Sequence, residues 1–109
     1  MKITTKDIDD VRIIYIHGHL DASTSPEAEK IILEHIDQEY DKIIINLENT
    51  EYMSSSGLRV ILKAAKKLRK TGTLRISNLT DIVEEIFQIS GFNTILNVDA
   101  TEQEALNNI

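Results

Sequence analysis

Three consecutive serines at positions 54–56 lie between an apolar stretch and a basic amphipathic segment. Hydroxyl groups at the start of a helix can cap free backbone N–H groups, bind an anion or accept a phosphate. A single cap needs only one serine. A phosphoserine here would add about −1.5 to −2 charges at pH 7, and the positive end of the helix dipole would stabilise it. The segment is therefore either a cap with spare hydroxyls or the acceptor of a charge-changing modification.

The serine segment matches neither a hydrolase motif nor a phosphate-binding loop. A nucleophile elbow has the pattern G-x-S-x-G; Gly57 follows Ser55 at the required distance, but Met53 occupies the place of the first glycine. The pattern G-x-x-x-x-G-K-[ST] is absent from the sequence. A small hydrolase using Ser55 remains an alternative, although the sequence indicates no general base nearby.

His17, His19 and Asp21 alternate along the chain, so on a strand they would share one face. This spacing allows either a metal site or the polar, solvent-facing end of a strand. No further ligand is indicated, and the absence of cysteine excludes thiolate ligands and disulfides. We therefore expect no metal, no cofactor and no catalytic residue, with a metal enzyme as the alternative.

The composition is that of an ordinary globular protein. The 109 residues are 41% hydrophobic and 28% charged, so we expect a single packed domain over residues 1–109. The net charge of −6 argues against direct nucleic-acid binding. No apolar run is long enough to span a membrane, and residues 1–7 do not resemble a signal peptide. We expect a cytoplasmic protein without membrane attachment.

Hydrophobic periodicity predicts strands that alternate with helices. Strands are expected at residues 3–6, 11–17, 42–47, 74–77 and 95–98, and helices from 26 to about 36, at about 56–70, at 79–90 and after 101. Ser25 is the predicted N-cap of the first helix, with Pro26 at its first position. The order ββαβαβαβα predicts an α/β domain with a mixed, mostly parallel sheet and helices packed on it.

Two loops are expected to meet at one edge of this sheet. The second and third predicted strands are joined by one helix and should be parallel, so their carboxyl ends lie on the same edge. Residues 18–21 follow the first of these ends and residues 54–57 follow the second. Ligands and partners often bind at this edge in open α/β sheets. The sequence thus predicts a docking patch from residues 21–25 and 52–59.

The predicted second helix carries half of the basic residues. Of the 12 lysines and arginines, these fall in it: Arg59, Lys63, Lys66, Lys67, Arg69 and Lys70. No acidic residue lies between positions 59 and 70. The cluster is either a solvated face whose charges suit the C-terminal dipole or a docking face for an acidic partner.

Residues 52–62, Tyr-Met-Ser-Ser-Ser-Gly-Leu-Arg-Val-Ile-Leu, resemble the signature of STAS-domain anti-sigma-factor antagonists. In that family a Met or Ile, an Asp, the phosphorylated Ser, a Ser or Ala and then Gly-Leu open the second helix. Residues 18–21, Gly-His-Leu-Asp, look like the family's Gly-Glu-Leu-Asp, and similarity extends over essentially the whole chain. Ser54 stands where the family usually has Asp, and His19 stands where it often has Glu.

The resemblance implies phosphorylation-controlled partner switching. Gly57 and Leu58 fix the frame, so Ser55 matches the phosphoserine, with Ser54 as a rival acceptor and Ser56 as the capping neighbour. The unmodified domain would bind an anti-sigma factor that is itself a serine protein kinase. Phosphorylation would release it, and a metal-dependent serine phosphatase would reverse the reaction. The residues that we assign to partner binding are Gly18, His19, Asp21, Ser23, Thr24, Tyr52, Met53, Ser54, Ser56, Gly57 and Arg59.

The same fold also occurs in domains that bind their partners constitutively. The alternative function is therefore a STAS binding subunit of a transport complex or of another signalling complex. The replacement of Asp by Ser54 makes this alternative worth testing.

Overall fold

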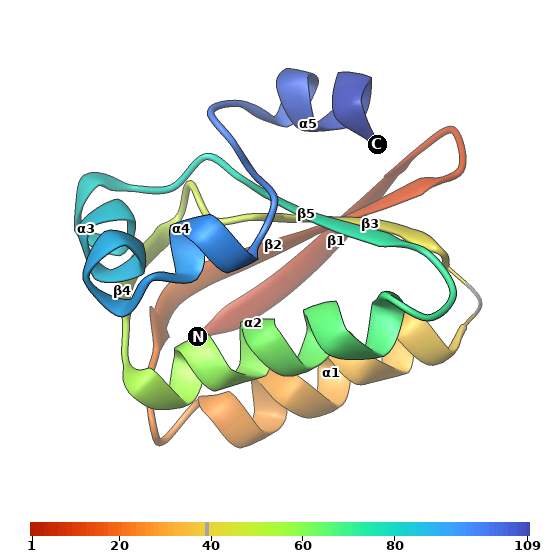
Figure 1. The fold of residues 1–109 in the computed structure, drawn as a ribbon. Coiled ribbons are helices and arrows are strands. Elements are labelled where there is room, and N and C mark those ends of the chain that lie inside the picture. The colour runs from red at the N-terminus through yellow and green to blue at the C-terminus, as the bar shows by residue number, and fades with distance from the viewer. Residues whose placement is uncertain (39) are drawn as a thin grey trace.

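The computed structural model describes residues 1–38 and 40–109 and shows a mixed sheet between two helical layers (Figure 1). The strands of the described residues are β1 (Lys2–Ile8), β2 (Val11–Leu20), β3 (Lys42–Asn46), β4 (Thr50–Met53), β5 (Thr73–Ser77) and β6 (Val98–Asp99). The sheet order is β1-β2-β3-β5-β6, and β4 pairs with the end of β2. Only the β1–β2 hairpin is antiparallel among the pairings of the described residues.

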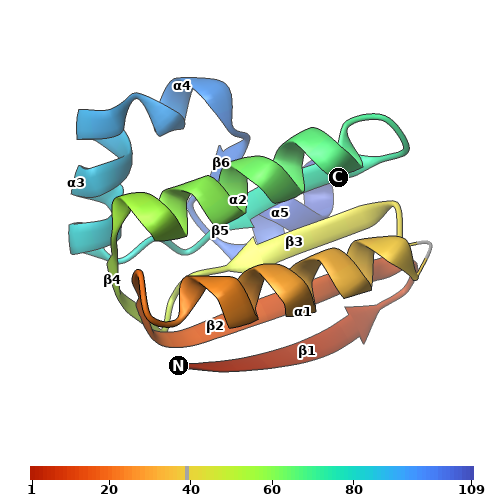
Figure 2. The ribbon, with the colours of Figure 1, turned by 90° about the horizontal axis from the view of Figure 1, so that it is seen from below.

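The helices cover both faces of this sheet. They are α1 (Ser25–Asp37), α2 (Ser55–Leu68), α3 (Asp81–Ser90), α4 (Phe92–Ile95) and α5 (Glu102–Asn108) in the part of the chain that the structure describes. Helices α1 and α2 lie side by side on one face, and α5 lies on the opposite face (Figures 1 and 2). Helix α3 packs against β4, and α4 packs against α3 (Figure 2).

The alternation of residues in β3 explains why this strand is apolar throughout. Ile43 and Ile45 belong to the main core beneath α1 and α2, whereas Ile44 packs with Ala105 of α5 on the other face. All three isoleucines are fully buried. The prediction of a central parallel strand covered on both sides is therefore confirmed.

The predicted fold class and order of elements are confirmed, with two short elements added and some boundaries corrected. The added elements are β4 and α4. The strand predicted at 95–98 was wrong in extent, because Ile95 ends α4 and β6 begins only at Val98. Gly91 ends α3 in the left-handed conformation, with φ at 79°, which glycine adopts without strain.

The start of α1 also differs from the prediction. Thr24 occupies the N-cap position, and Ser25 is a buried residue of the first turn. Pro26 lies within this turn, where its missing N–H costs nothing. None of the helices in the described residues is long and apolar enough to cross a membrane.

Candidate functional site

Strand β4 pairs with β2 and thereby brings the two predicted loops together. It runs parallel to the end of β2, pairing Gly18 with Thr50, His19 with Tyr52 and Leu20 with Met53. A bulge between Gly18 and His19 shifts the register there. The predicted common edge is present, and it is formed by hydrogen-bonded neighbouring strands rather than by loops alone.

Of the three serines, Ser54 is the cap of α2. Its hydroxyl accepts a hydrogen bond from the N–H of Gly57 at 3.4 Å, and its own N–H donates to the carbonyl of Leu20 at 2.9 Å. The expectation that Ser56 caps the helix was wrong, because α2 already begins at Ser55. Ser56 lies half-buried in the first turn, and Ser55 is exposed at the first helical position.

Gly57 lets the first turn of α2 lie directly against the sheet. A Cβ atom at this position would lie 2.5 Å from the Leu20 carbonyl oxygen and 2.8 Å from Cγ of Met53. Both distances are far below van der Waals contact, so only glycine permits this approach. Gly57 and Met53 are themselves buried, and they position the surface from beneath it.

The carboxylate of Asp21 organises the loop between β2 and α1. Oδ1 accepts hydrogen bonds from the hydroxyl of Ser23 at 2.7 Å, the N–H of Ser23 at 2.9 Å and the N–H of Thr24 at 3.2 Å. These bonds, that of the Ser23 hydroxyl first, lower the pKa of Asp21. The Thr24 hydroxyl also donates to the carbonyl of His19 at 2.8 Å. The loop is thus held in one conformation by its own side chains.

The exposed rim of the site carries a histidine, a glutamate and a tyrosine. Nε2 of His19 lies 3.3 Å from Oε2 of Glu51, and the ring centroids of His19 and Tyr52 are 6.1 Å apart. Tyr52 is 43% exposed, so its ring and hydroxyl are open to a partner. Glu51 was missed in the sequence, because simple alternation on a strand places it on the same face as the buried Met53 and so gives no signal for an exposed side chain.

The two histidines at the end of β2 have separate partners. Nε2 of His17 lies 3.1 Å from the Thr4 hydroxyl on β1, whereas His19 pairs with Glu51. No group of three or more His, Asp or Glu side chains among the described residues is arranged to hold a metal.

A groove between the N-terminal ends of α1 and α2 adjoins Ser55. Ser56, Arg59 and Lys63 line it from α2, and Pro26 and Glu29 line it from α1. Lys63 pairs with Glu29 at 3.0 Å. Arg59 is exposed, and no carboxylate of the described residues lies within ion-pair distance of it. It is one helical turn after Ser55, so the local field around this hydroxyl is positive.

Comparison with known proteins agrees with this arrangement. The model of the STAS domain family matches residues 2–105. The chain is 35% identical to BtrV of Bordetella bronchiseptica, over 96% of this chain and 90% of that protein. It is 30% identical to the anti-sigma-B factor antagonist of Staphylococcus aureus, over 95% of this chain and 98% of that protein.

Solved structures share the fold. The unphosphorylated form of the anti-sigma factor antagonist SpoIIAA superposes with a TM-score of 0.81 and 26% identity, covering 98% of this chain and 95% of that chain. The phosphorylated form of the Bacillus protein SpoIIAA gives a TM-score of 0.73 at 25% identity, covering 98% of both chains. With a family model that spans nearly the whole sequence and relatives of this kind, the chain belongs to the STAS-domain family of anti-sigma-factor antagonists.

Proposed function

We propose that this protein switches partners through phosphorylation of Ser55. In its unmodified form it binds an anti-sigma factor that is also a serine protein kinase, and the sigma factor is thereby freed. The kinase transfers the γ-phosphoryl group of ATP to the Ser55 hydroxyl, and the complex dissociates. A metal-dependent serine phosphatase hydrolyses the phosphoserine and restores binding. The protein itself performs no catalysis in this cycle.

The exposure of Ser55 at the first position of α2 is the observation that carries the proposal. Its neighbours Ser54 and Ser56 are half-buried, and Ser54 is engaged in the cap. Ser55 is therefore the hydroxyl of the three that a kinase can reach most easily. The related protein SpoIIAA has been solved in a phosphorylated and an unphosphorylated form, which supports transfer of this role.

The charge of a phosphate is sufficient to break such a complex. A dianion that is buried in an interface without a cationic partner raises the free energy of the complex by the cost of removing its water. A hundredfold loss of affinity needs only about 2.7 kcal/mol. We also propose that the partner binds to one surface, called the Ser55 surface below. It is formed by His19, Ser23, Tyr52, Ser55 and Arg59.

The test is phosphorylation by the cognate kinase with ATP, followed by mapping of the modified residue by mass spectrometry. We expect phosphate on Ser55 in the wild type and in the Ser54→Ala variant, and none in Ser55→Ala. Phosphate on neither Ser54 nor Ser55 would contradict the mechanism. Phosphate on Ser54 alone would move the switch by one residue.

Binding measurements separate the switch from a constitutive binding subunit. Ser55→Ala should bind the unmodified partner like the wild type, and Ser55→Glu should bind it at least about tenfold more weakly. Equal affinities of these variants would favour the constitutive subunit of a transport or signalling complex. We further propose that the domain spans residues 1–109 and acts in the cytoplasm, without direct contact to nucleic acid or membrane.

A further inference from the structure

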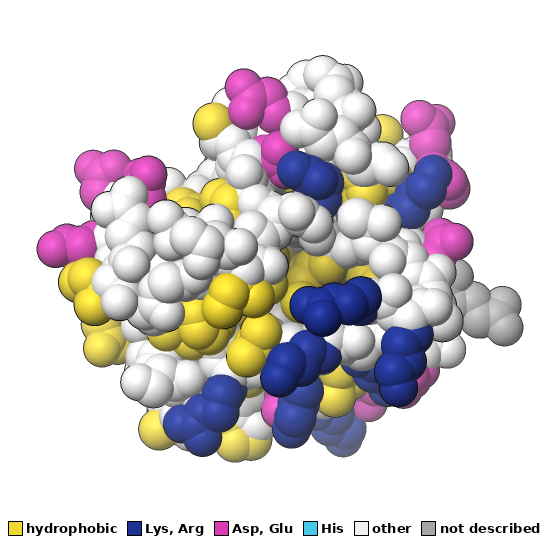
Figure 3. Space-filling model, viewed as in Figure 1, with side chains coloured by type: hydrophobic (Ala, Val, Ile, Leu, Met, Phe, Trp, Pro, Cys, Tyr) yellow, Lys and Arg dark blue, Asp and Glu magenta, His cyan; other side chains and the backbone are white. Residues whose placement is uncertain are grey.

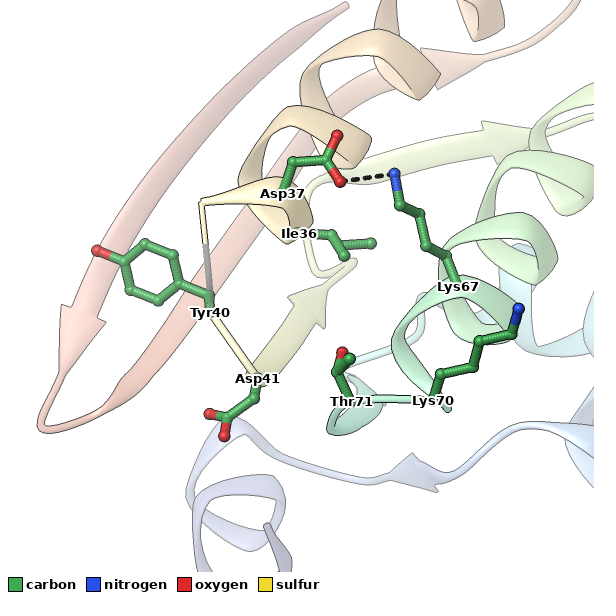
Figure 4. Close-up of a pocket in the computed structure, with 7 residues that line it drawn as sticks. All are labelled: Ile36, Asp37, Tyr40, Asp41, Lys67, Lys70 and Thr71. Carbon is green, nitrogen blue, oxygen red and sulfur yellow. Dashed lines mark ion pairs between the residues drawn. The ribbon is translucent and has the colours of Figure 1, made fainter.

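The basic residues of α2 divide into two groups with different surroundings. On the side that faces α1, Lys63 pairs with Glu29 at 3.0 Å and Lys67 pairs with Asp37 at 2.7 Å. Figure 4 shows the Lys67–Asp37 pair at the C-terminal ends of these two helices, where Lys70 lies beside them. Lys63 and Lys67 are thus paired with carboxylates of α1, whereas Lys70 has no ion pair among the described residues.

The side of α2 that faces α4 is different. Lys66 and Arg69 are exposed there, and neither has a carboxylate within 4.0 Å among the described residues. Leu62 lies four residues before Lys66 and seven before Arg69, so the three side chains are neighbours on the helix surface. Two uncompensated cations on a molecule with a net charge of −6 form a local positive patch.

Next to these cations the surface is hollowed, and one large aliphatic side chain is exposed at the edge of the hollow. A groove between α2 and α4 has a mixed lining of apolar and polar residues, which are Ala65, Arg69, Gly72, Thr73, Leu74, Ile95, Leu96 and Asn97. Ile95 is 54% exposed, although it is a large aliphatic residue. Figure 3 shows hydrophobic side chains gathered beside the lysines and arginines of α2 on this face. An exposed aliphatic side chain in a hollow with a polar and charged rim is a feature of interaction surfaces.

We infer that this α2–α4 groove is a second docking surface, which binds an acidic amphipathic segment of a partner protein. An aliphatic side chain of the segment would enter the groove against Ile95 and Leu96, and its carboxylates would pair with Lys66 and Arg69. Charge complementarity favours this occupant, because an acidic segment provides the counter-charges that the described residues lack on this side. The inference does not depend on the proposed switch, since it uses no residue of the Ser55 surface.

An anionic membrane is a poorer occupant for the same surface. A planar anionic bilayer would lie against the exposed carboxylates of Asp81, Glu84 and Glu85 on the neighbouring α3 as well as against the two cations, whereas a single short segment contacts the groove and the cations alone. A narrow groove also fits a side chain of a folded segment better than it fits a planar lipid surface.

The experiment uses a fluorescently labelled synthetic helical peptide of about 16 residues, long enough to form a helix on binding. Leucines at i, i+3, i+4 and i+7 give it one apolar face, and glutamates occupy the other positions. A scrambled peptide of the same composition, without an apolar face, is the control. Fluorescence anisotropy at physiological ionic strength should show at least about tenfold tighter binding of the amphipathic peptide.

Variants then locate the binding. We expect the double variant Lys66→Glu/Arg69→Glu and the variant Ile95→Ser each to weaken binding at least about tenfold. Lys2→Glu/Lys30→Glu, which makes the same charge change at exposed remote positions, should bind like the wild type, and so should Ser55→Ala. Amide chemical shifts should move at residues 62–69 and 95–96.

Several outcomes would overturn the inference. These are equal binding of the scrambled peptide, equal loss in the remote Lys2/Lys30 variant, or chemical shifts confined to residues 19–24 and 52–56. Binding to phosphatidylglycerol vesicles without binding to the peptide would identify the surface as a lipid contact instead. Self-association in sedimentation that Arg69→Glu abolishes would identify it as an interface between copies of the chain.

Discussion

At the scale of single residues, three adjacent serines have three different environments. Ser54 is part of the helix cap, Ser55 faces the solvent, and Ser56 lines the groove beside α1. Their chemistry is identical, so the difference arises from backbone geometry alone. The cap position fixes which of the neighbouring hydroxyls points outward, and a one-residue shift of the helix start would give each serine another role.

Replacing Ser54 by alanine should destabilise the protein by about 1 kcal/mol, because the N–H of Gly57 loses its acceptor. Urea denaturation measures this change. Ser56→Ala is the matched control and should alter the free energy of unfolding by less than about 0.5 kcal/mol. A larger effect of Ser56→Ala than of Ser54→Ala would contradict the assignment of the cap.

Replacing Gly57 by alanine should cost about 1–3 kcal/mol despite the better helix propensity of alanine. The new methyl group would meet the Leu20 carbonyl oxygen and Met53, and neither the backbone nor the buried side chain can move freely. Thermal unfolding reports the loss. Ser56→Ala is the control. Gly91→Ala is unsuitable as a control, because φ at Gly91 is positive and alanine would be strained there. Unchanged stability would show that α2 can shift away from the sheet.

The position of this site could be predicted from the sequence better than the hydrogen bonds inside it. Residue types and the parallel-strand rule predicted which loops meet, and the structure brings residues 18–24 and 52–59 together. The internal hydrogen bonds of Asp21 and the choice of Ser54 as the cap depend on backbone angles that are set by tertiary contacts. Composition and spacing do not encode these angles one residue at a time.

At the scale of elements, short segments were the ones that the sequence misplaced. Strand β4 has four residues, and both central ones, Glu51 and Tyr52, are exposed. It is held by pairing with β2 and by a hydrogen bond from the Thr80 hydroxyl to the Thr50 carbonyl at 3.1 Å. Such a strand has no periodic apolar signal, because its stability comes from partners distant in sequence. Helices α1 and α2 are long and have a clear apolar periodicity, so they could be predicted from the sequence alone.

Helix α5 offers a test of how one element is attached. Oε1 of Glu102 accepts hydrogen bonds from the Tyr15 hydroxyl at 2.6 Å and from the side-chain amide of Asn46 at 3.1 Å. Burial, and then the hydrogen bond to Glu102, raise the pKa of Tyr15, so this hydroxyl stays protonated and donates. The carboxylate thus fastens the start of α5 to two strands.

We expect Glu102→Ala to accelerate amide hydrogen exchange in α5 by about tenfold or more while leaving the amides of α2 unchanged. The exposed Gln103 beside it, whose side chain bonds to Asn107 within α5 rather than to a strand, provides the comparison variant Gln103→Ala. Hydrogen exchange followed by NMR distinguishes the two. Uniform acceleration over all elements would mean that α5 unfolds only together with the rest of the domain.

At the scale of the whole molecule, anchored carboxylates make folding dependent on pH. Hydrogen bonds from Arg75, and secondarily from Asn108, lower the pKa of the buried Asp99 below its ordinary range. Bonds from Ser23 lower the pKa of Asp21, and bonds from Arg12 lower that of Asp7. A lowered pKa in the folded state means that unfolding takes up protons. The stabilisation is complete above the ordinary carboxyl pKa and is lost as the pH falls through the folded-state values.

The free energy of unfolding should therefore decline below about pH 4, where unfolded carboxyl groups begin to bind protons. Asp99→Asn should lower stability at neutral pH, because Arg75 loses a charged partner at 2.6 Å, and should make the acid decline shallower. Urea titrations at a series of pH values measure both effects. A decline as steep as that of the wild type would mean that Asp99 does not contribute to it. Glu104→Gln, at an exposed position, serves as the control.

The hydrogen bonds around the Ser55 surface have a consequence for the rates of association. The Ser54 N–H bonds to Leu20, the Thr24 hydroxyl bonds to His19, and the Thr80 hydroxyl bonds to Thr50, so each segment of the surface is tied to a neighbouring one. Little chain ordering then remains to be done when a partner arrives. Association should proceed in a single phase without a slow conformational step. Substitutions on this surface should therefore change chiefly the dissociation rate of the complex.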